Sequence, residues 1–265
     1  MIVSRVTLPL AIVGSWLLGL LSYAGSLGML FAEALRGCLA RPLRIRLIVY
    51  EIWKVGAQSL FIVSLSSLFI GMVLALQSAY QMQRLAAEMY IASLVALSVV
   101  REIGPVMTAL IVAGRVGSAI AAELGTMNVT EQIDALRTLA IDPVRYLVVP
   151  RLIATVIALP LLTLWANALG ILGGFIIGTV KLDILASLYW KMTTRPLVFK
   201  DLSSGLLKAL VFALIICIAS CYEGFRTEGG AEGVGRSTTA AVVSSFILII
   251  AADCLLTALF YFAWR

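Results

Sequence analysis

Long apolar stretches separated by short charged segments dominate this chain. About 20 apolar residues are enough to cross the hydrocarbon core of a bilayer, and five of the stretches beyond the N-terminal region reach or exceed that length. We therefore predict an all-α integral membrane protein. A flexible glycine-rich loop, "RTEGGAEGVGRS" (226–237), is expected between the last two spans. The predicted spans are residues 55–82, 89–123, 152–180, 202–222 and 237–264.

The N-terminal region allows two interpretations. Val6–Ala32 carries no charge, and hydropathy alone favours a sixth span there. Its glycines and the basic residues that follow also suit a helix lying in the cytoplasmic leaflet. A signal peptide is disfavoured because the apolar region is too long and no clear cleavage site follows. The basic run from Arg36 to Lys54 places the start of the first span in the cytoplasm.

Composition excludes several classes of function. Hydrophobic residues make up 62% of the chain and charged residues only 13%, about half the share found in soluble domains. The chain has no histidine, the commonest metal ligand and general base. It also lacks a GxxxxGK[ST] phosphate loop. We expect no metal, no cofactor and no enzymatic activity in this chain. Its net charge of +6 indicates contact with anionic headgroups before nucleic acid.

Five ionisable residues lie well inside the predicted spans: Arg101, Glu102, Arg115, Lys208 and Asp253. Each costs about 2.5–3.5 kcal/mol at the membrane centre. Adjacent helical residues point about 100° apart, so Arg101 and Glu102 need separate partners. We expect a network, facing the interior, in which Arg101 and Lys208 are balanced by Glu102 and Asp253. Two roles stay open for it, a passage that contacts substrate or structural ion pairs between helices.

A different pattern fills the segment between the second and third spans. Asn128 resembles a helix N-cap with Glu131 at the third position, and apolar residues then recur at helical spacing. We predict a short amphipathic helix over 128–141, either a surface connector or a docking helix for a separate ATPase. The residues expected to touch that partner are Asn128, Glu131, Gln132, Asp134 and Arg137.

Two further features concern helix packing. Arg115 and Glu123, eight residues apart on nearly the same face, are expected to brace the docking helix against the core. Small residues recur at four-residue spacing, which lets helix backbones approach closely in lipid. These ladders predict packing seams within one subunit or between two. Their members are Gly117, Ala121 and Gly125, and Gly170, Gly174 and Gly178.

Several motifs resemble one known family. The segment 94–151 holds an ordered series, "REIGP", "AGRVGSA", "EQIDAL", "DP" and "PR". "FIGMVLALQ" (69–77), "ALPLLT" (158–163) and "DCLLTALF" (253–260) fit the same pattern. Together they resemble the MlaE/YrbE family of ABC-transporter permeases, over roughly residues 43–262.

The resemblance implies a fold and a set of partners. It implies five spans in a permease domain (43–265), preceded by an interfacial elbow helix (1–42), in place of the sixth span that hydropathy favours. It also implies a homodimer that works with a cytoplasmic ABC ATPase, which binds ATP and Mg, a STAS-domain regulatory protein and a periplasmic MCE-domain hexamer. Such assemblies, in the bacterial inner membrane, move phospholipid and maintain outer-membrane lipid asymmetry.

Other functions remain as alternatives. The permease could carry another hydrophobic substrate, such as a sterol or a toluene-like compound. A secondary transporter for an ion or small solute could use the buried charges as a relay, but we find no convincing internal repeat. An intramembrane enzyme is disfavoured, because no serine–histidine, metal or paired-aspartate constellation is present.

Overall fold

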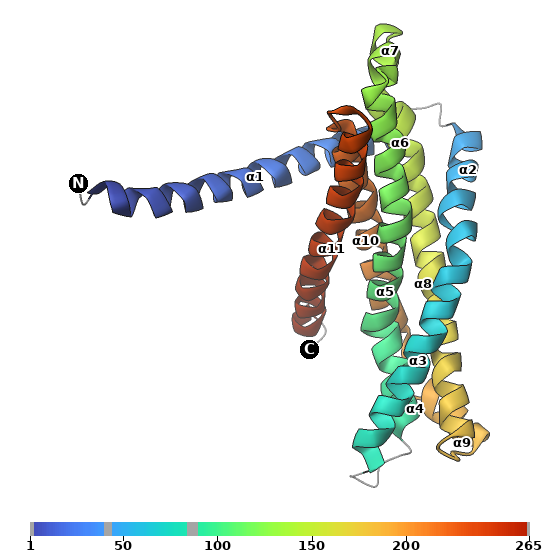
Figure 1. Ribbon diagram of the computed structural model, residues 1–265. Coiled ribbons are helices and arrows are strands. Elements are labelled where there is room, and N and C mark those ends of the chain that lie inside the picture. Colours follow the sequence, from blue (N-terminus) through green and yellow to red (C-terminus); the bar gives the residue numbers. More distant parts are fainter. Residues whose placement is uncertain (1–2, 40–43, 84–89, 264–265) are drawn as a thin grey trace.

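The computed structural model describes residues 3–39, 44–83 and 90–263, and all the regular elements within these ranges are helices. Figure 1 shows most of them aligned in one elongated bundle. In chain order they are α1 (Val3–Leu39), α2 (Ile45–Val55), η1 (Ala57–Ser59), α3 (Leu60–Gln83), α4 (Ile91–Ser98), η3 (Val99–Ile103), α5 (Gly104–Val112), η4 (Ala113–Gly117), α6 (Ser118–Val129), α7 (Gln132–Thr138), η5 (Val144–Val148), α8 (Val149–Val180), α9 (Ala186–Thr194), α10 (Phe199–Phe225) and α11 (Gly230–Ala263).

Within the described ranges, five helical segments are long and apolar enough to cross a membrane, which confirms the predicted all-α protein with five spans. The first span begins at Ile45, before the predicted start at residue 55. The amphipathic helix α2, which buries Ile48 and Val55, leads directly into the apolar run and lengthens the span. The predicted start at Met89 and the predicted end at Trp264 lie outside the described residues. The observed spans are Ile45–Met82, Ile91–Val129, Val144–Val180, Phe199–Phe225 and Gly230–Phe262.

Helix α10 lies at the centre of the packing, in contact with α5, α6, α8 and α11, while α3 packs along α8. Phe212 and Ile216 of α10 are fully buried in the main core. A side chain at Gly71 would overlap the backbone of Gly170, and one at Gly173 would overlap the carbonyl of Leu68. The α3 and α8 backbones therefore touch directly, as small residues allow in lipid.

The two predicted glycine ladders both face partners within this chain. Gly117 and Gly125 lie against Ser220 and Thr227, on and just after α10. In the second ladder, Gly170 faces Val99, Gly174 faces Val95 and Tyr189, and Gly178 lies on the ring of Tyr189. Ala121 is fully buried in the same seam as Gly117. The structure accounts for these positions by packing inside one subunit.

Helix α1 lies apart from the other long helices. Figure 1 shows it running away from one end of the bundle, across the direction of the spans. Its C-terminal part packs against η5, α8 and α10. Ala34 is fully buried there, and the hydroxyl of Tyr23 donates a hydrogen bond of 2.8 Å to Glu223. Leu18, Leu21 and Met29 are exposed.

The glycine-rich loop predicted over 226–237 is much shorter in the structure. Helix α11 already begins at Gly230, so the connection to α10 is a tight turn. Gly229 and Gly230 have φ values of +86° and +68°, a backbone region that glycine enters at little cost. The glycines thus serve a sharp reversal and a helix start. The predicted flexible loop is wrong beyond Gly229.

The helix predicted over 128–141 is also shorter than expected. Helix α6 continues through Val129, so Asn128 lies in its last turn and does not cap a new helix. Glu131 adopts a left-handed backbone (φ +60°), and α7 starts only at Gln132. Ala140 (φ +56°) ends it, with the N–H of Ile141 bonded back to the carbonyl of Leu136 at 2.9 Å.

Candidate functional site

A cleft of about 430 Å³ opens between η3, α10 and α11, toward the end of the bundle opposite α7. It is lined by most of the charges predicted to lie inside the membrane. η3 contributes Arg101 and Glu102, and α11 contributes Thr257, Phe260 and Tyr261. The residues from the first turns of α10 are Lys200, Asp201, Ser204 and Lys208.

The local backbone explains how Arg101 and Glu102 reach this cleft. They lie in η3, a π-helical turn directly before Gly104-Pro105. Proline has no N–H to give to the carbonyl four residues earlier, and the turn widens so that the Gly104 N–H bonds to Val99. Such widened turns occur frequently at functional sites.

A glycine on α10 lets this helix approach η3 closely. A side chain at Gly205 would overlap the carbonyl oxygen of Val100 and lie 3.3 Å from Cγ of Pro105. Gly205 lies one turn before Lys208 on α10. The close approach therefore brings the lysine within reach of the η3 side chains.

Lys208 is the buried centre of the first ion-pair group. Its side chain is 1% exposed. The ammonium group pairs with Glu102, lies 2.9 Å from Oδ1 of Asp253, and donates a hydrogen bond of 2.7 Å to Oγ1 of Thr257. The structure thus brings Lys208, Glu102 and Asp253 together as the sequence predicts. Thr257, four residues after Asp253 on α11, was missed because a hydroxyl in an apolar helix gives no charge signal.

Arg101 has a different partner from the one predicted. Its Nε and Nη2 lie 2.8 and 2.7 Å from Oδ1 of Asp201, and Oδ2 of Asp201 accepts the Val198 N–H at 3.1 Å. The expectation that Arg101 is balanced by Glu102 or Asp253 is therefore wrong. Asp201 lies one residue before the predicted span 202–222 and was not singled out from the sequence. Asp201 lies in the first turn of α10, where a carboxylate is favourable, but this position gives no sign of its pairing with Arg101.

The cleft presents both signs of charge to an incoming molecule. Asp201 and Lys208 are almost completely buried, whereas the side chains of Arg101 and Glu102 are 52% and 42% exposed. Three basic residues line the cleft, Arg101, Lys200 and Lys208. Three carboxylates balance their charge: Glu102 and Asp201 line the cleft, and Asp253 pairs with Lys208. An arginine can bind phosphate oxygens through paired hydrogen bonds, and a neighbouring carboxylate suits a cationic group. The arrangement can bind an amphiphile with a zwitterionic headgroup.

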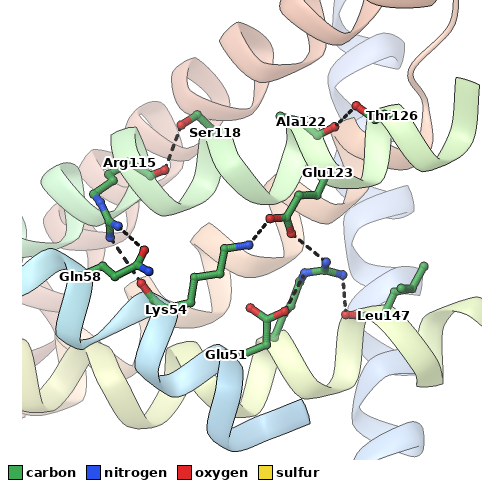
Figure 2. Close-up of polar contacts among 10 residues, drawn as sticks. Glu51, Lys54, Gln58, Arg115, Ser118, Ala122, Glu123, Thr126 and Leu147 are labelled. Atoms are coloured by element: carbon green, nitrogen blue, oxygen red, sulfur yellow. Dashed lines mark hydrogen bonds and ion pairs between the residues drawn. The ribbon is translucent and has the colours of Figure 1, made fainter.

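A second charged group ties three spans together nearer the α7 end (Figure 2). Arg151 of α8 is buried, with Nη2 3.0 Å from Glu123 of α6 and Nε 3.6 Å from Glu51 of α2. Glu123 also pairs with Lys54 of α2, and Nη1 of Arg151 donates to the carbonyl of Leu147 at 3.0 Å. We call Glu51, Lys54, Glu123 and Arg151 the inter-span cluster. The predicted spans begin at residues 55 and 152, so Lys54 and Arg151 were expected just outside them.

Arg115 belongs to the same side of the bundle. From η4, it donates to Oγ of Ser59 at 2.8 Å and to Oε1 of Gln58 at 2.7 Å. The expectation that Arg115 and Glu123 brace the docking helix is wrong. The eight-residue spacing does place them on one face, but Figure 2 shows Arg115 directed at Gln58 and Glu123 at Lys54, so this face meets α2 and η1.

Helix α7 presents a charged face beyond the end of the bundle. Ile133 is buried and anchors the helix. Four of the five residues predicted to contact the ATPase lie on or just before α7 and are exposed. Asp134 and Arg137 pair with each other at 2.8 Å. Asn128 is separate from this face, since its amide donates to the carbonyl of Thr227 at 3.0 Å. The exposed residues are Glu131, Gln132, Asp134 and Arg137.

Metal binding has no support in the part of the chain that the structure describes. No group of three or more cysteine, aspartate or glutamate side chains is placed to hold an ion there. The cysteines Cys38, Cys217, Cys221 and Cys254 are free.

Five spans, a charged cleft among them and a short exposed helix between the second and third define a multi-pass membrane permease. The family model described as permease MlaE matches residues 48–259, and the chain belongs to this family. A probable ABC transporter permease protein of Rickettsia prowazekii is 48% identical over 228 residues, 86% of this chain and 88% of the relative. The chain is accordingly an ABC transporter permease.

Two further relatives bear on the substrate class. The intermembrane phospholipid transport system permease protein MlaE of Haemophilus influenzae is 38% identical over 216 residues, 81% of this chain and 83% of that protein. The chloroplastic protein trigalactosyldiacylglycerol 1 of Arabidopsis thaliana is 41% identical over 211 residues, 80% of this chain and 60% of that protein.

Proposed function

We propose that this chain is the permease subunit of a phospholipid transporter, and that the headgroup passes through the charged cleft. One observation carries the proposal: the half-exposed charged residues Arg101 and Glu102 line the same cleft as the aromatic residues Phe260 and Tyr261. A phospholipid needs polar groups for its phosphate and apolar walls for its tails. The Haemophilus relative is a phospholipid transport permease, which supports this substrate class.

The charge balance favours a zwitterionic headgroup. Arg101 keeps Nη1 outside its bonds to Asp201, and this nitrogen can donate to a phosphate oxygen. Glu102, partly exposed beside it, suits the ammonium group of a lipid such as phosphatidylethanolamine. A sterol or a toluene-like compound has no group to use this pair of charges. A relay for ions would need a continuous polar path, whereas Lys208 is enclosed by its three partners.

We propose that two copies of the chain form the working permease. Helices α3 and α11 are the least buried of the spans, and α11 keeps large apolar residues exposed, among them Ile247 and Ile250. Because α11 also supplies one wall of the cleft, a second copy packed against it would enclose the lipid path. Helix α1 would lie as an elbow in the cytoplasmic leaflet, consistent with its direction across the spans.

The remaining partners follow from family membership and from the position of α7. A separate ABC ATPase would bind ATP and Mg and dock on the exposed face of α7, as a permease without a phosphate loop requires. A STAS-domain protein would regulate that ATPase. On the opposite side of the bacterial inner membrane, a periplasmic MCE-domain hexamer would exchange lipid with the cleft and so support outer-membrane lipid asymmetry.

Mass spectrometry of lipid bound to the purified chain tests the proposal. The wild-type chain and the double variant R101Q/E102Q would be purified from the same membranes in mild detergent, with R46Q/E228Q as a control of equal charge change outside the cleft. We expect bound phosphatidylethanolamine to fall at least about fivefold in the cleft variant and to be unchanged in the control. Equal phospholipid content in all three samples, or bound sterol in place of phospholipid, would contradict the proposal.

A further inference from the structure

A second cleft, of about 320 Å³, lies at the α7 end of the bundle, far from the charged cleft described above. It forms where the end of α1, the start of α2, and the turn from α7 into η5 meet. Arg44 and Arg145 line it together with Tyr146, and Asp142 lies beside them. We call this the basic cleft. The function proposed above uses none of these residues.

The electrostatics of the basic cleft favour an anion. The guanidinium of Arg44 lies 4.2 Å from the ring centroid of Tyr146, which holds it in place at the cleft wall. Oδ1 of Asp142 accepts the backbone N–H groups of Val144 and Arg145 at 2.9 and 3.4 Å, so this carboxylate is committed to the start of η5. Two arginines and one carboxylate, which accepts backbone N–H groups, therefore line the cleft, and its lining carries a net positive charge.

An apolar surface runs from the basic cleft along α2. Ile45, Val49 and Trp53 follow one another at four-residue spacing and are 71%, 59% and 54% exposed. Tyr50 lies beside Trp53, with ring centroids 6.4 Å apart. Tyrosine and tryptophan gather at the interface between headgroups and acyl chains. The outer face of α2 thus has the character of a surface that contacts acyl chains near the membrane boundary.

The basic cleft lies on the side that the positive charges assign to the cytoplasm. The basic segment before the first span and the segment around α7 meet at this end of the bundle (Figure 1). Basic clefts between membrane helices on this side bind the headgroups of anionic lipids. If a phospholipid bound here with its phosphate at Arg44 and Arg145, its acyl chains would lie along the exposed apolar face of α2.

We propose that the basic cleft binds one anionic phospholipid of the cytoplasmic leaflet, with its phosphate between Arg44 and Arg145. This lipid is separate from the transported one. It joins α1 and α2 to the turn after α7, where Ala140 holds a left-handed backbone. Its presence would therefore stabilise the position of the helix on which an ATPase is proposed to dock.

Native mass spectrometry of the full chain in detergent tests this site, with dioleoylphosphatidylglycerol as the anionic probe and dioleoylphosphatidylcholine as the neutral one. The double variant R44Q/R145Q removes both guanidinium groups from the cleft. Its matched control, R36Q/R46Q, removes two exposed arginines of the same region that do not line it. We expect one phosphatidylglycerol per chain to bind about tenfold more weakly to R44Q/R145Q, and within twofold of wild type to R36Q/R46Q.

Further arms make each outcome decisive. The conservative variant R44K/R145K should retain lipid binding within about threefold. If R44Q/R145Q fails to fold, the single variant R44Q, at an exposed side chain, takes its place and should weaken lipid binding about threefold. Equal loss in both glutamine doubles, or equal affinity for phosphatidylcholine, would overturn the site. Displacement of the lipid by millimolar glycerol phosphate would indicate a site for a soluble anion. Unchanged lipid binding with loss of ATPase association would indicate a protein-docking surface.

The transport cleft provides an independent control. The variant R101Q/E102Q should keep the tightly bound phosphatidylglycerol, because its substitutions lie at the other cleft. Loss of phosphatidylethanolamine in that variant with phosphatidylglycerol retained would support both proposals separately. Retention of both lipids would count against the transport cleft alone.

Discussion

The ammonium group of Lys208 on α10 lies 2.9 Å from a carboxylate oxygen of Asp253 on α11. The same group pairs with Glu102 on η3, so one buried cation joins three spans. Because α11 is the least buried span, these contacts are an important part of what holds it beside α10. The lysine therefore has a structural role as well as a place beside the proposed lipid path.

Removing this lysine should destabilise the folded chain more than removing one of its partners. In K208M, Asp253 and Glu102 lose their shared cation, and breaking a buried pair in this way costs about 3–5 kcal/mol. In D253N, Lys208 keeps Glu102 and Thr257. We expect a larger fall in melting temperature in detergent for K208M than for D253N. The combination K208M/D253N should recover part of the loss, and no recovery would contradict the pairing.

Arg101 and Asp201 should show measurable coupling in a double-mutant cycle. R101Q removes the cation that pairs with the buried Asp201 carboxylate, which keeps its bond from the Val198 N–H, whereas D201N leaves an arginine that can turn to solvent. We therefore expect R101Q to lower the unfolding free energy at least as much as D201N. The coupling energy should be about 1–3 kcal/mol. Chemical unfolding in detergent measures it, and additive effects would show that the two side chains act independently.

The close approach of α10 to η3 should make Gly205 sensitive to a single methyl group. In G205A the new Cβ would meet the carbonyl of Val100 and the ring of Pro105. We expect a loss of about 1–3 kcal/mol in stability. Gly114 offers a matched control in η4, because no atom lies within 4 Å of the position its Cβ would take. Equal melting temperatures for G205A and G114A would contradict the packing described here.

Charge reversal on α7 should uncouple ATP hydrolysis from transport. E131K reverses a charge at the start of the exposed helix, while E228K makes the same change in the turn before α11 at the same end of the bundle. In the reconstituted complex, we expect E131K to lower ATP-driven lipid transfer at least about fivefold while the complex stays assembled. E228K should have less than a twofold effect. Normal transfer by assembled E131K would remove the docking role of α7.

The backbone at Glu131 gives a separate prediction. A non-glycine residue at φ +60° is disfavoured. Replacing it with glycine should remove the left-handed backbone cost of about 1–2 kcal/mol. The greater freedom of glycine in the unfolded chain offsets about 0.5–1 kcal/mol of this gain, so we expect a net rise in stability of about 0.5–1 kcal/mol. Thermal unfolding of E131G against wild type measures the net change. A lower melting temperature for E131G would show that the Glu131 side chain itself stabilises the turn.

The apolar patterning predicted the spans well because span length reports the thickness of the hydrocarbon core. It also brought Lys208, Glu102 and Asp253 together, since charges inside spans must find partners. The ends of the helices were harder to predict. Asp201 lies just outside the apolar run, and only the tertiary packing of α10 on η3 reveals it as the partner of Arg101.

Local patterns failed where long-range contacts compete with them. Asn128 has the spacing of a helix cap, but Leu124 and Met127 keep α6 packed into the core, and the Asn128 amide finds the carbonyl of Thr227 instead. Arg151 reads as a loop charge, yet the third span begins before it and buries it against Glu51 and Glu123. The local sequence pattern around Asn128 or Arg151 gives no indication of these long-range contacts.

ATP-dependent transfer of phosphatidylethanolamine by the reconstituted complex tests the central claim most directly. The comparison uses wild type, R101Q, R101K and the control R46Q, with ATP hydrolysis measured in parallel. We predict that R101Q lowers transfer at least about tenfold, as expected for the loss of a charged hydrogen bond, while R101K loses less and R46Q stays within twofold. Wild-type transfer rates in R101Q would contradict a lipid path through this cleft.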